Sequence, residues 1–280
     1  MAVVIVCGVL FALALLAAFV WRNEELIAPP APDPDGPRLD RLRHHLWWMQ
    51  LVLVTALLAG TLVMGVGGRL AMRLLGATGG DAAQGRLTEA DQVVGRITVG
   101  GTIGFVFFIG VLSGLVTTIF WFATRRFLPA GWTGGLLFGA ALLVVLGTRI
   151  DPLRAGNEDF DLVGPWWLSI VTFTALALAF GIALSSYSAR ISRWLPVLGR
   201  DRRSLSYVAL LALVPLFPFG ILAVVTGLLY VFGGPLLARV RSALTGPTGL
   251  RTTRLAIGFL VAAATPGFLL AIGDLVGRGP

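Results

Sequence analysis

The sequence predicts an all-α protein, a bundle of transmembrane helices that crosses the membrane about seven times. Hydrophobic residues make up 56% of the 280 residues and charged residues only 13%, whereas a soluble domain needs about a quarter of its residues charged. The mean hydropathy is +0.87. Several apolar runs reach roughly 20 residues, the length with which a helix crosses about 30 Å of hydrocarbon. These runs lack the apolar–polar alternation of a membrane β-barrel.

The charge balance indicates which partners the chain meets. The formal net charge is +8, and all 22 basic residues are arginine, as is typical of a GC-rich bacterial genome. In a membrane protein a positive balance first indicates contact with anionic lipid headgroups. No basic patch lies on a soluble domain, so we expect no nucleic acid partner. Cys7 is the one cysteine, which excludes an internal disulfide. We expect a multi-pass protein of the plasma membrane.

The chain divides into three parts. Residues 1–21 form a first transmembrane helix, because the basic start and small-residue cleavage site of a signal peptide are missing. Residues 22–45 form a Pro-rich polar linker, because proline at the density of APPAPDPDGP cannot continue a helix. Residues 46–280 form the membrane-embedded bundle, with polar loops at 67–96 and 149–165. Its spans are expected near 46–66, 97–123, 132–147, 166–186, 205–232 and 255–275. Every Trp and Tyr lies at or near a predicted end, where interfacial aromatic residues belong.

The segment 205–232 has two interpretations. It carries Pro215, Pro218 and Gly220 near its middle, and we expect one kinked helix that crosses with some tilt. The alternative is a re-entrant hairpin, which leaves six spans. The positive-inside rule favours the alternative, because a hairpin divides the arginines fifteen to seven between the two sides and a crossing divides them twelve to ten.

Small residues four apart predict where helices pack closely, since little hydrophobic force acts between helices in lipid. Spacing of four places them on one helix face. We therefore expect the third, fourth and fifth spans to form the tight centre of the bundle. The helix-packing glycines are Gly100, Gly104, Gly110 and Gly114 in the third span and Gly131, Gly135 and Gly139 in the fourth.

The two polar loops together are the candidate site. Two spans separate them, so both face the same compartment, where arginines of one loop can meet acids of the other. Thr88, followed by Glu89 and Asp91, has the pattern of a helix start with acids in its first turn. The candidate ligand-binding residues are Arg69, Arg73, Arg96, Arg149, Arg154, Glu158, Asp159 and Asp161.

These residues suit a salt-bridge lattice that braces the loops, or a site for an anionic ligand. The tract from Asn157 to Asp161 lacks the spacing of a calcium loop, and adjacent histidines His44 and His45 point to different faces of a helix. We therefore predict no metal, no cofactor and no catalytic residue, and we leave enzymatic activity uncertain but unfavoured, because no catalytic motif is present.

The sequence predicts a non-catalytic membrane protein whose loop cluster braces the bundle or binds a partner or an anionic headgroup. A homo-oligomer or a partner membrane subunit fits the same interpretation. One alternative is a transporter or permease in which the Pro-broken sixth segment lines a path. A second alternative is a lipid-modifying membrane enzyme that uses the loop carboxylates.

Overall fold

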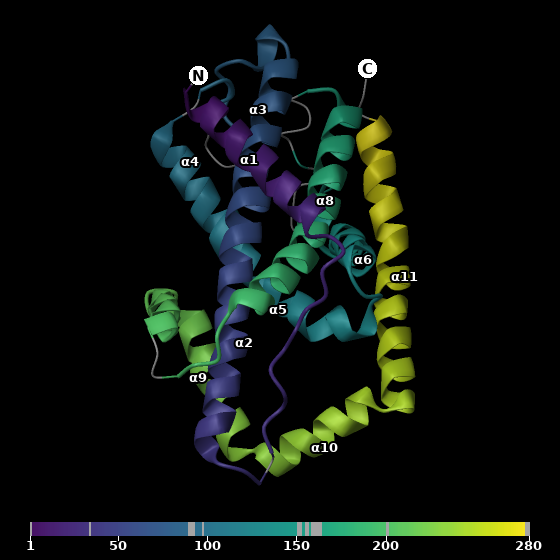
Figure 1. Cartoon of the computed structure of the whole chain (residues 1–280). Coiled ribbons are helices and arrows are strands. Elements are labelled where there is room, and N and C mark those ends of the chain that lie inside the picture. Colours follow the sequence, from purple (N-terminus) through teal and green to yellow (C-terminus); the bar gives the residue numbers. More distant parts are fainter. Residues whose placement is uncertain are drawn as a thin grey trace.

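The computed structural model describes residues 2–33, 35–88, 93–96, 98–149, 153–154, 157, 164–199 and 202–277. Every named element in these ranges is a helix (Figure 1). The elements are α1 (Ala2–Val20), α2 (Arg38–Ala59), η1 (Gly60–Gly67), α3 (Gly68–Thr78), η2 (Asp81–Ala83), α4 (Val99–Phe105), η3 (Val106–Leu112), α5 (Ser113–Thr124), η4 (Arg125–Phe127), α6 (Trp132–Leu142), η5 (Leu143–Gly147), α8 (Trp166–Trp194), η6 (Arg202–Leu213), α9 (Phe217–Phe232), α10 (Gly234–Thr245) and α11 (Pro247–Gly277).

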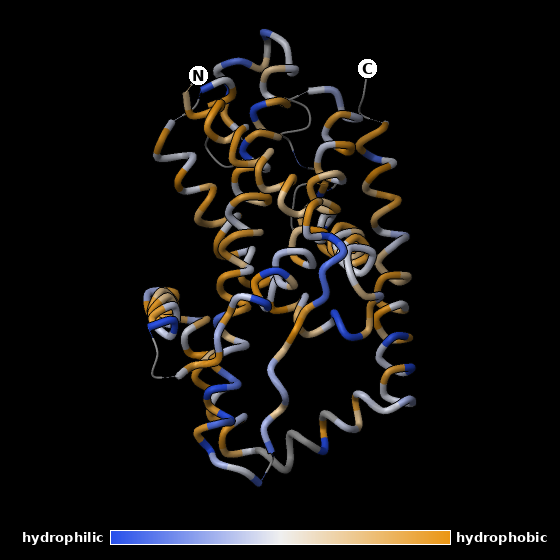
Figure 2. Tube along the Cα trace, in the orientation of Figure 1, coloured by the Kyte–Doolittle hydropathy of each residue, from blue (hydrophilic) through white to orange (hydrophobic). Residues whose placement is uncertain are grey.

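The predicted helical bundle is confirmed, whereas the count of seven spans is not. In the described part of the chain, five helices are long and apolar enough to cross a membrane: Ala2–Val20, Arg38–Thr78, Val99–Phe127, Trp166–Trp194 and Pro247–Gly277. Two apolar helices, Trp132–Gly147 and Phe217–Phe232, are shorter. Figure 2 shows hydrophobic residues along most of these helices and hydrophilic residues in the upper loops, in the extended strap and around the lower helix ends.

One rod, α2–η1–α3, runs the length of the molecule (Figure 1). Its 41 residues rise about 60 Å, twice the thickness of a hydrocarbon core. The prediction of a linker to residue 45 and a loop from residue 67 was wrong at both ends. The segment RLDRLRHH after Pro37 holds no helix breaker. Gly67 and Gly68 continue the helix, and Phe11, Phe105 and Leu176 of neighbouring helices lie against them.

Glycines bring the second and third predicted spans into backbone contact. A methyl group on Gly114 would lie 2.8 Å from the Cα of Gly60, and one on Gly65 would lie 3.2 Å from the Cα of Gly110. Both contacts fall in or beside η1 and η3, which are π-helical and therefore wider than an α-helix. No described atom lies within 4 Å of a methyl group built on Gly100 or Gly104.

A second backbone contact joins α6 to α8. A methyl group on Gly135 would lie 2.9 Å from the carbonyl carbon of Gly181, and one on Gly139 would lie 3.0 Å from that of Ala177. Gly131 stands just before α6 with φ +70°. The close backbone contacts therefore join the second span to the third and the fourth to the fifth, rather than uniting the third, fourth and fifth.

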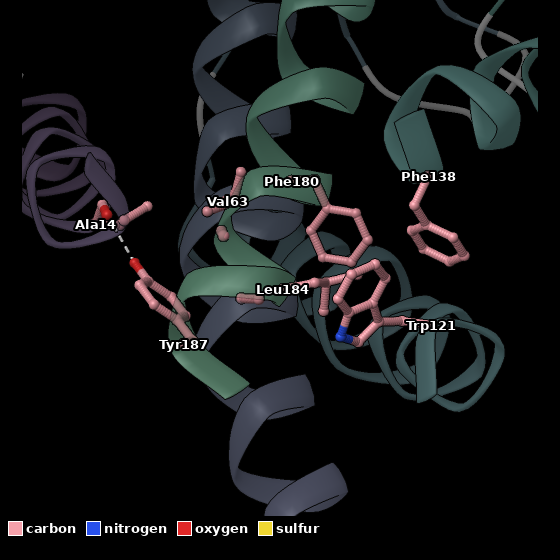
Figure 3. Close-up of a cluster of buried hydrophobic side chains, with 10 residues drawn as sticks. Ala14, Val63, Trp121, Phe138, Phe180, Leu184 and Tyr187 are labelled. Atoms are coloured by element: carbon pink, nitrogen blue, oxygen red, sulfur yellow. Dashed lines mark hydrogen bonds between the residues drawn. The ribbon is translucent and has the colours of Figure 1, made fainter. Parts of the chain in front are cut away.

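The buried core lies where α1, α5, α6 and α8 meet η1 (Figure 3). The rings of Trp121 and Phe138 have centroids 5.4 Å apart. The hydroxyl of Tyr187 donates a hydrogen bond of 2.7 Å to the carbonyl oxygen of Ala14. Trp121 and Tyr187 were expected at the interface, but both side chains turn inward and are buried. Each finds a polar partner inside the protein, since the Trp121 Nε1 donates to the Ser188 hydroxyl at 3.4 Å.

The segment 202–232 is not one kinked helix. It forms η6, a turn and α9, and both arms lie beside α2. Gln50 Nε2 donates to the carbonyl oxygen of Ser206 at 3.0 Å in the first arm. The Arg38 guanidinium lies 5.1 Å from the Phe232 ring centroid at the end of the second. The turn packs near Ala56. Proline in the turn breaks the helix because it lacks an N–H donor.

The last helix, α11, connects the two ends of the bundle. Near its start, Arg254 Nε donates to the carbonyl oxygen of Phe127 at 3.2 Å. Near its end, Leu275 packs with Leu143 and Leu153. The amphipathic helix α10 lies across the bottom of the molecule and leads into α11 (Figure 1).

Candidate functional site

The described parts of the two predicted loops lie at the upper end of the molecule, where the first loop contains α3 (Figure 1). A methyl group on Gly164, just before α8, would lie 2.9 Å from the Thr78 hydroxyl and 3.1 Å from a methyl of Leu75. The end of the second loop therefore packs on the last turn of α3. The buried Leu153 ties the same loop to η5 and α11.

Arg69 and Arg73 lie on α3 and reach the segment before and inside α4. Arg69 Nε donates to the Thr102 hydroxyl at 3.3 Å. Arg73 Nη1 donates to the carbonyl oxygen of Gly95 at 3.4 Å. These two hydrogen bonds join α3 to the segment around the start of α4, as expected for residues that brace the loop.

The helix start predicted at Thr88 lies elsewhere. The residue that caps α4 is Thr98, whose hydroxyl accepts from the Gly101 N–H at 3.1 Å. Leu87, next to Thr88, instead forms an isolated bridge with Val93. Glu89 and Asp91 lie outside the described residues.

The structure describes the remaining predicted ligands only in part. Arg149, in the turn after η5, donates from Nη1 to the carbonyl oxygen of Val145 in that helix at 2.8 Å. Arg96 is exposed and Arg154 is half-buried. Glu158, Asp159 and Asp161 lie outside the described residues, so the exchange of ion pairs between the loops stays a prediction.

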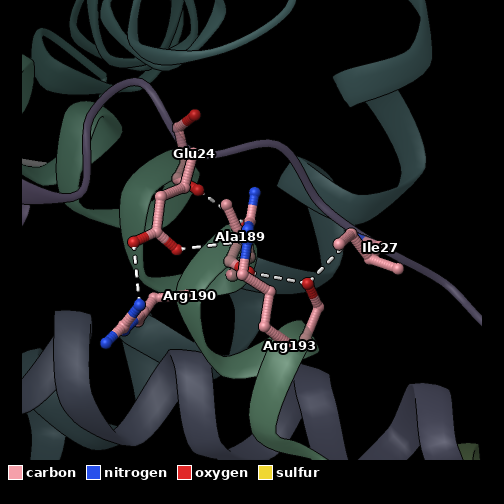
Figure 4. A network of polar contacts seen from close by, with 8 residues as sticks. Glu24, Ile27, Ala189, Arg190 and Arg193 are labelled. Atoms are coloured by element: carbon pink, nitrogen blue, oxygen red, sulfur yellow. Dashed lines mark hydrogen bonds and ion pairs between the residues drawn. The ribbon is translucent and has the colours of Figure 1, made fainter.

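A polar network that the sequence did not reveal fixes the strap between α1 and α2 (Figure 4). Glu24 lies 3.0 Å from Arg190 Nη1 and 3.3 Å from Arg193 Nε. The backbone N–H of Ile27 donates to the Ser192 hydroxyl at 3.0 Å. The arginines belong to the last turns of α8, where the helix dipole favours cations. A separation of 166 residues leaves no local sequence signal for this pairing.

Several arginines lie over aromatic rings, and we call this set the basic-aromatic belt. Such cation–π contacts are favourable for a guanidinium. The belt comprises Arg22 over Phe19 (3.7 Å to the ring centroid), Arg125 over Trp48 (5.3 Å), Arg126 over Phe127 (4.7 Å) and Arg190 over Trp194 (4.4 Å).

The two histidines hold α9 on α2. The ring of His44 stacks on Tyr230 with centroids 5.8 Å apart and planes 10° apart. Trp48 Nε1 donates to His44 Nε2 at 2.9 Å, and His45 Nε2 donates to the carbonyl oxygen of Ala223 at 3.1 Å. Among the described residues no group of three or more His, Cys, Asp or Glu side chains is placed to hold a metal.

No protein-family model, no curated protein and no solved structure matches this chain.

Proposed function

We propose that the chain is a multi-pass protein of the plasma membrane with six crossings and one re-entrant hairpin. This topology is supported by contacts between helix ends that are distant in the chain, because such contacts join ends that lie at the same level of the bundle. Arg254 lies beside Phe127 at the lower end, and Leu275 lies beside Leu143 at the upper end. The proposed crossings are α1, the upper part of α2–η1–α3, α4–η3–α5, α6–η5, α8 and α11 beyond Arg254.

The distribution of arginine supports an orientation with the lower half in the cytoplasm. By chain position, seven of the 22 arginines fall on the upper side: Arg69, Arg73, Arg86, Arg96, Arg149, Arg154 and Arg278. The other fifteen fall on the lower side: Arg22, Arg38, Arg41, Arg43, Arg125, Arg126, Arg190, Arg193, Arg200, Arg202, Arg203, Arg239, Arg241, Arg251 and Arg254. Cytoplasmic loops carry such an excess.

The proposed role is non-catalytic: the upper loops brace the bundle, and the lower face binds anionic lipid headgroups. The basic-aromatic belt is the single observation that carries this proposal. Aromatic rings and arginines together suit the interface between hydrocarbon and water, and arginine forms bidentate hydrogen bonds with phosphate. Bracing is supported by the bonds that Arg69 and Arg73 make to the segment around α4.

Reconstitution tests the lipid-binding role. The protein is placed in nanodiscs of phosphatidylcholine alone or with one-third phosphatidylglycerol, and its Tm is measured at low and high salt. We expect the anionic lipid to raise the Tm, and we expect 0.5 M salt to reduce the difference, because salt screens charge pairs. Equal Tm values in both lipids at low salt would refute the role. Native mass spectrometry of the same samples reports a second copy or a partner subunit.

A transporter is the second candidate, and the hairpin of η6 and α9 is the observation that favours it. Broken helices that enter the membrane often line transport paths, and Pro215 and Pro218 lie in or beside the turn of this hairpin. Single cysteines from Phe217 to Gly220, introduced after Cys7→Ser, would react with a water-soluble maleimide if the turn lines an aqueous path. Uniform protection of these positions would rule the path out.

A further inference from the structure

We propose that the phosphate of an anionic phospholipid binds at η4, against the side chains of Arg125, Arg126 and Arg254. This η4 site rests on the proposed lipid-binding function and assigns it to one place. It lies at the lower end of α5, where the 3-10 turn Arg125–Phe127 ends the helix.

Two of the arginines belong to this turn, and the third contacts it from another helix. Arg126 lies over the Phe127 ring, with 4.7 Å between the guanidinium carbon and the ring centroid. Arg254 comes from α11, and its Nε donates to the Phe127 carbonyl oxygen at 3.2 Å. A guanidinium carries five N–H donors, so this bond leaves Arg254 four for another acceptor.

Arg125 lies against an aromatic floor. Its guanidinium carbon is 5.3 Å from the Trp48 ring centroid and 5.7 Å from the Phe122 ring centroid. The side chain is half-buried, so water solvates its charge less than that of a fully exposed arginine. These contacts are of the cation–π kind, and the guanidinium carries five N–H donors for other acceptors.

The charge of this cluster is not balanced within the described protein. Among the described residues, no carboxylate forms a salt bridge with Arg125, Arg126 or Arg254. The arginine pair of α8 provides a direct contrast, because Glu24 lies between Arg190 and Arg193. The adjacent positive charges of Arg125 and Arg126 repel each other. An anion bound at η4 would offset that repulsion and accept hydrogen bonds from the remaining N–H groups.

Position and surroundings favour a lipid phosphate over a free one. The turn lies at the end of a membrane-length helix, at the depth where headgroups lie. Leu255 and Phe259 follow Arg254 along α11 and are 73% and 76% exposed. The acyl chains of a bound lipid can pack on this apolar surface beside the arginines. Inorganic phosphate has no apolar part that could pack there.

Native mass spectrometry of the detergent-solubilised protein with added phosphatidylglycerol tests the η4 site. The variants are Arg126→Gln, Arg254→Gln and the double variant Arg125→Gln/Arg126→Gln. We expect each to lower the affinity for the first lipid about tenfold, as loss of a charged hydrogen bond predicts. Arg203→Gln is the matched control, since Arg203 is an exposed arginine of the same side, and it should keep the wild-type affinity. The Arg126 side chain makes no hydrogen bond to the backbone among those described, so Arg126→Gln separates lipid binding from folding. The Tm is measured for all variants.

Each outcome decides the question. Wild-type affinity in all three η4 variants overturns the η4 site, and so does an equal loss in Arg203→Gln, which would show diffuse charge attraction. Neither result contradicts the proposed function, which is tested separately by the effect of phosphatidylglycerol on the Tm of the wild type in nanodiscs. A lower Tm with unchanged affinity in Arg254→Gln identifies Arg254 as a helix brace and removes it from the site. If millimolar inorganic phosphate displaces the lipid, the site binds a soluble anion, and the proposal of a lipid ligand is overturned. Absence of any effect of phosphatidylglycerol on the wild type refutes both proposals.

Discussion

Glu24 lies 3.0 Å from Arg190, and this ion pair joins the strap after α1 to the end of α8. The same carboxylate also faces Arg193, so one acid balances two cations. The pair is partly buried, with 30% of the Arg190 side chain and 21% of the Glu24 side chain exposed. The strap is thereby held along the bundle rather than left as the loose linker that its prolines alone suggest.

We predict that Glu24→Gln lowers stability in detergent by about 1 kcal/mol at low salt, because it leaves two neighbouring arginines without their anion. Thermal unfolding by circular dichroism measures the change. Glu25→Gln is the control, because Glu25 is an exposed acid next to it and should cost nothing measurable. Adding Arg190→Gln to Glu24→Gln should recover part of the loss. If the two changes simply add, the ion pair is not the source of the stability.

Gly135 and Gly100 allow a paired test of helix packing. A methyl group on Gly135 would meet the backbone of Gly181, whereas a methyl group on Gly100 meets no described atom within 4 Å. We expect Gly135→Ala to destabilise the bundle by about 1–3 kcal/mol, because backbone cannot move aside as a flexible side chain can. Gly100→Ala should be neutral or slightly stabilising, because alanine is the better helix former. Size-exclusion profiles and Tm in detergent check both, and equal effects would contradict the packing described for α6 and α8.

The sequence predicted the helical bundle because apolar runs of membrane length leave few other structures. Gly135 and Gly139 lie against the backbone of α8, whereas Gly100 and Gly104, which have the same spacing, have no described atom within 4 Å of a methyl group built on them. Spacing identifies the face of a helix and does not identify which neighbour covers it. For this reason the spacing alone does not predict that the second span packs on Gly110 and Gly114.

The candidate site was predicted less well, because its contacts depend on distant parts of the chain. The spacing of Arg69 and Arg73 places them on one helix face but does not predict their partners, which are Thr102 and a backbone carbonyl. The cluster at η4 needs Arg254, which no local pattern connects with Arg125. The arginine count favours a hairpin over a crossing at 205–232, and the path of this segment through the membrane stays a prediction.

Tyr187 and Ala14 make α1 part of the core. The Tyr187 hydroxyl is buried and donates to the Ala14 carbonyl oxygen at 2.7 Å. We expect Tyr187→Phe to cost about 1 kcal/mol, the net contribution of one hydrogen bond, with little change in packing. Deleting residues 2–20 should cost far more, since Ala14 and Ala18 are both buried in that core. Tm in detergent measures both changes. An unchanged Tm after the deletion would show that α1 is not needed for the bundle.

Leu205 and Phe232 stand near the two ends of the hairpin, and their sidedness decides the topology. Both are well exposed, at 68% and 62%, and we predict that both face the cytoplasm. Single cysteines at these positions, in a Cys7→Ser background, should react with a membrane-impermeant maleimide in inside-out vesicles and stay unreacted in right-side-out vesicles. A cysteine at Arg96, which is exposed in the upper loop, should show the opposite pattern and serves as the control. Reaction of the two hairpin cysteines from opposite sides would restore the seventh crossing. It would also move α10 to the other face and separate Arg254 from η4, contradicting the bond between Arg254 and Phe127.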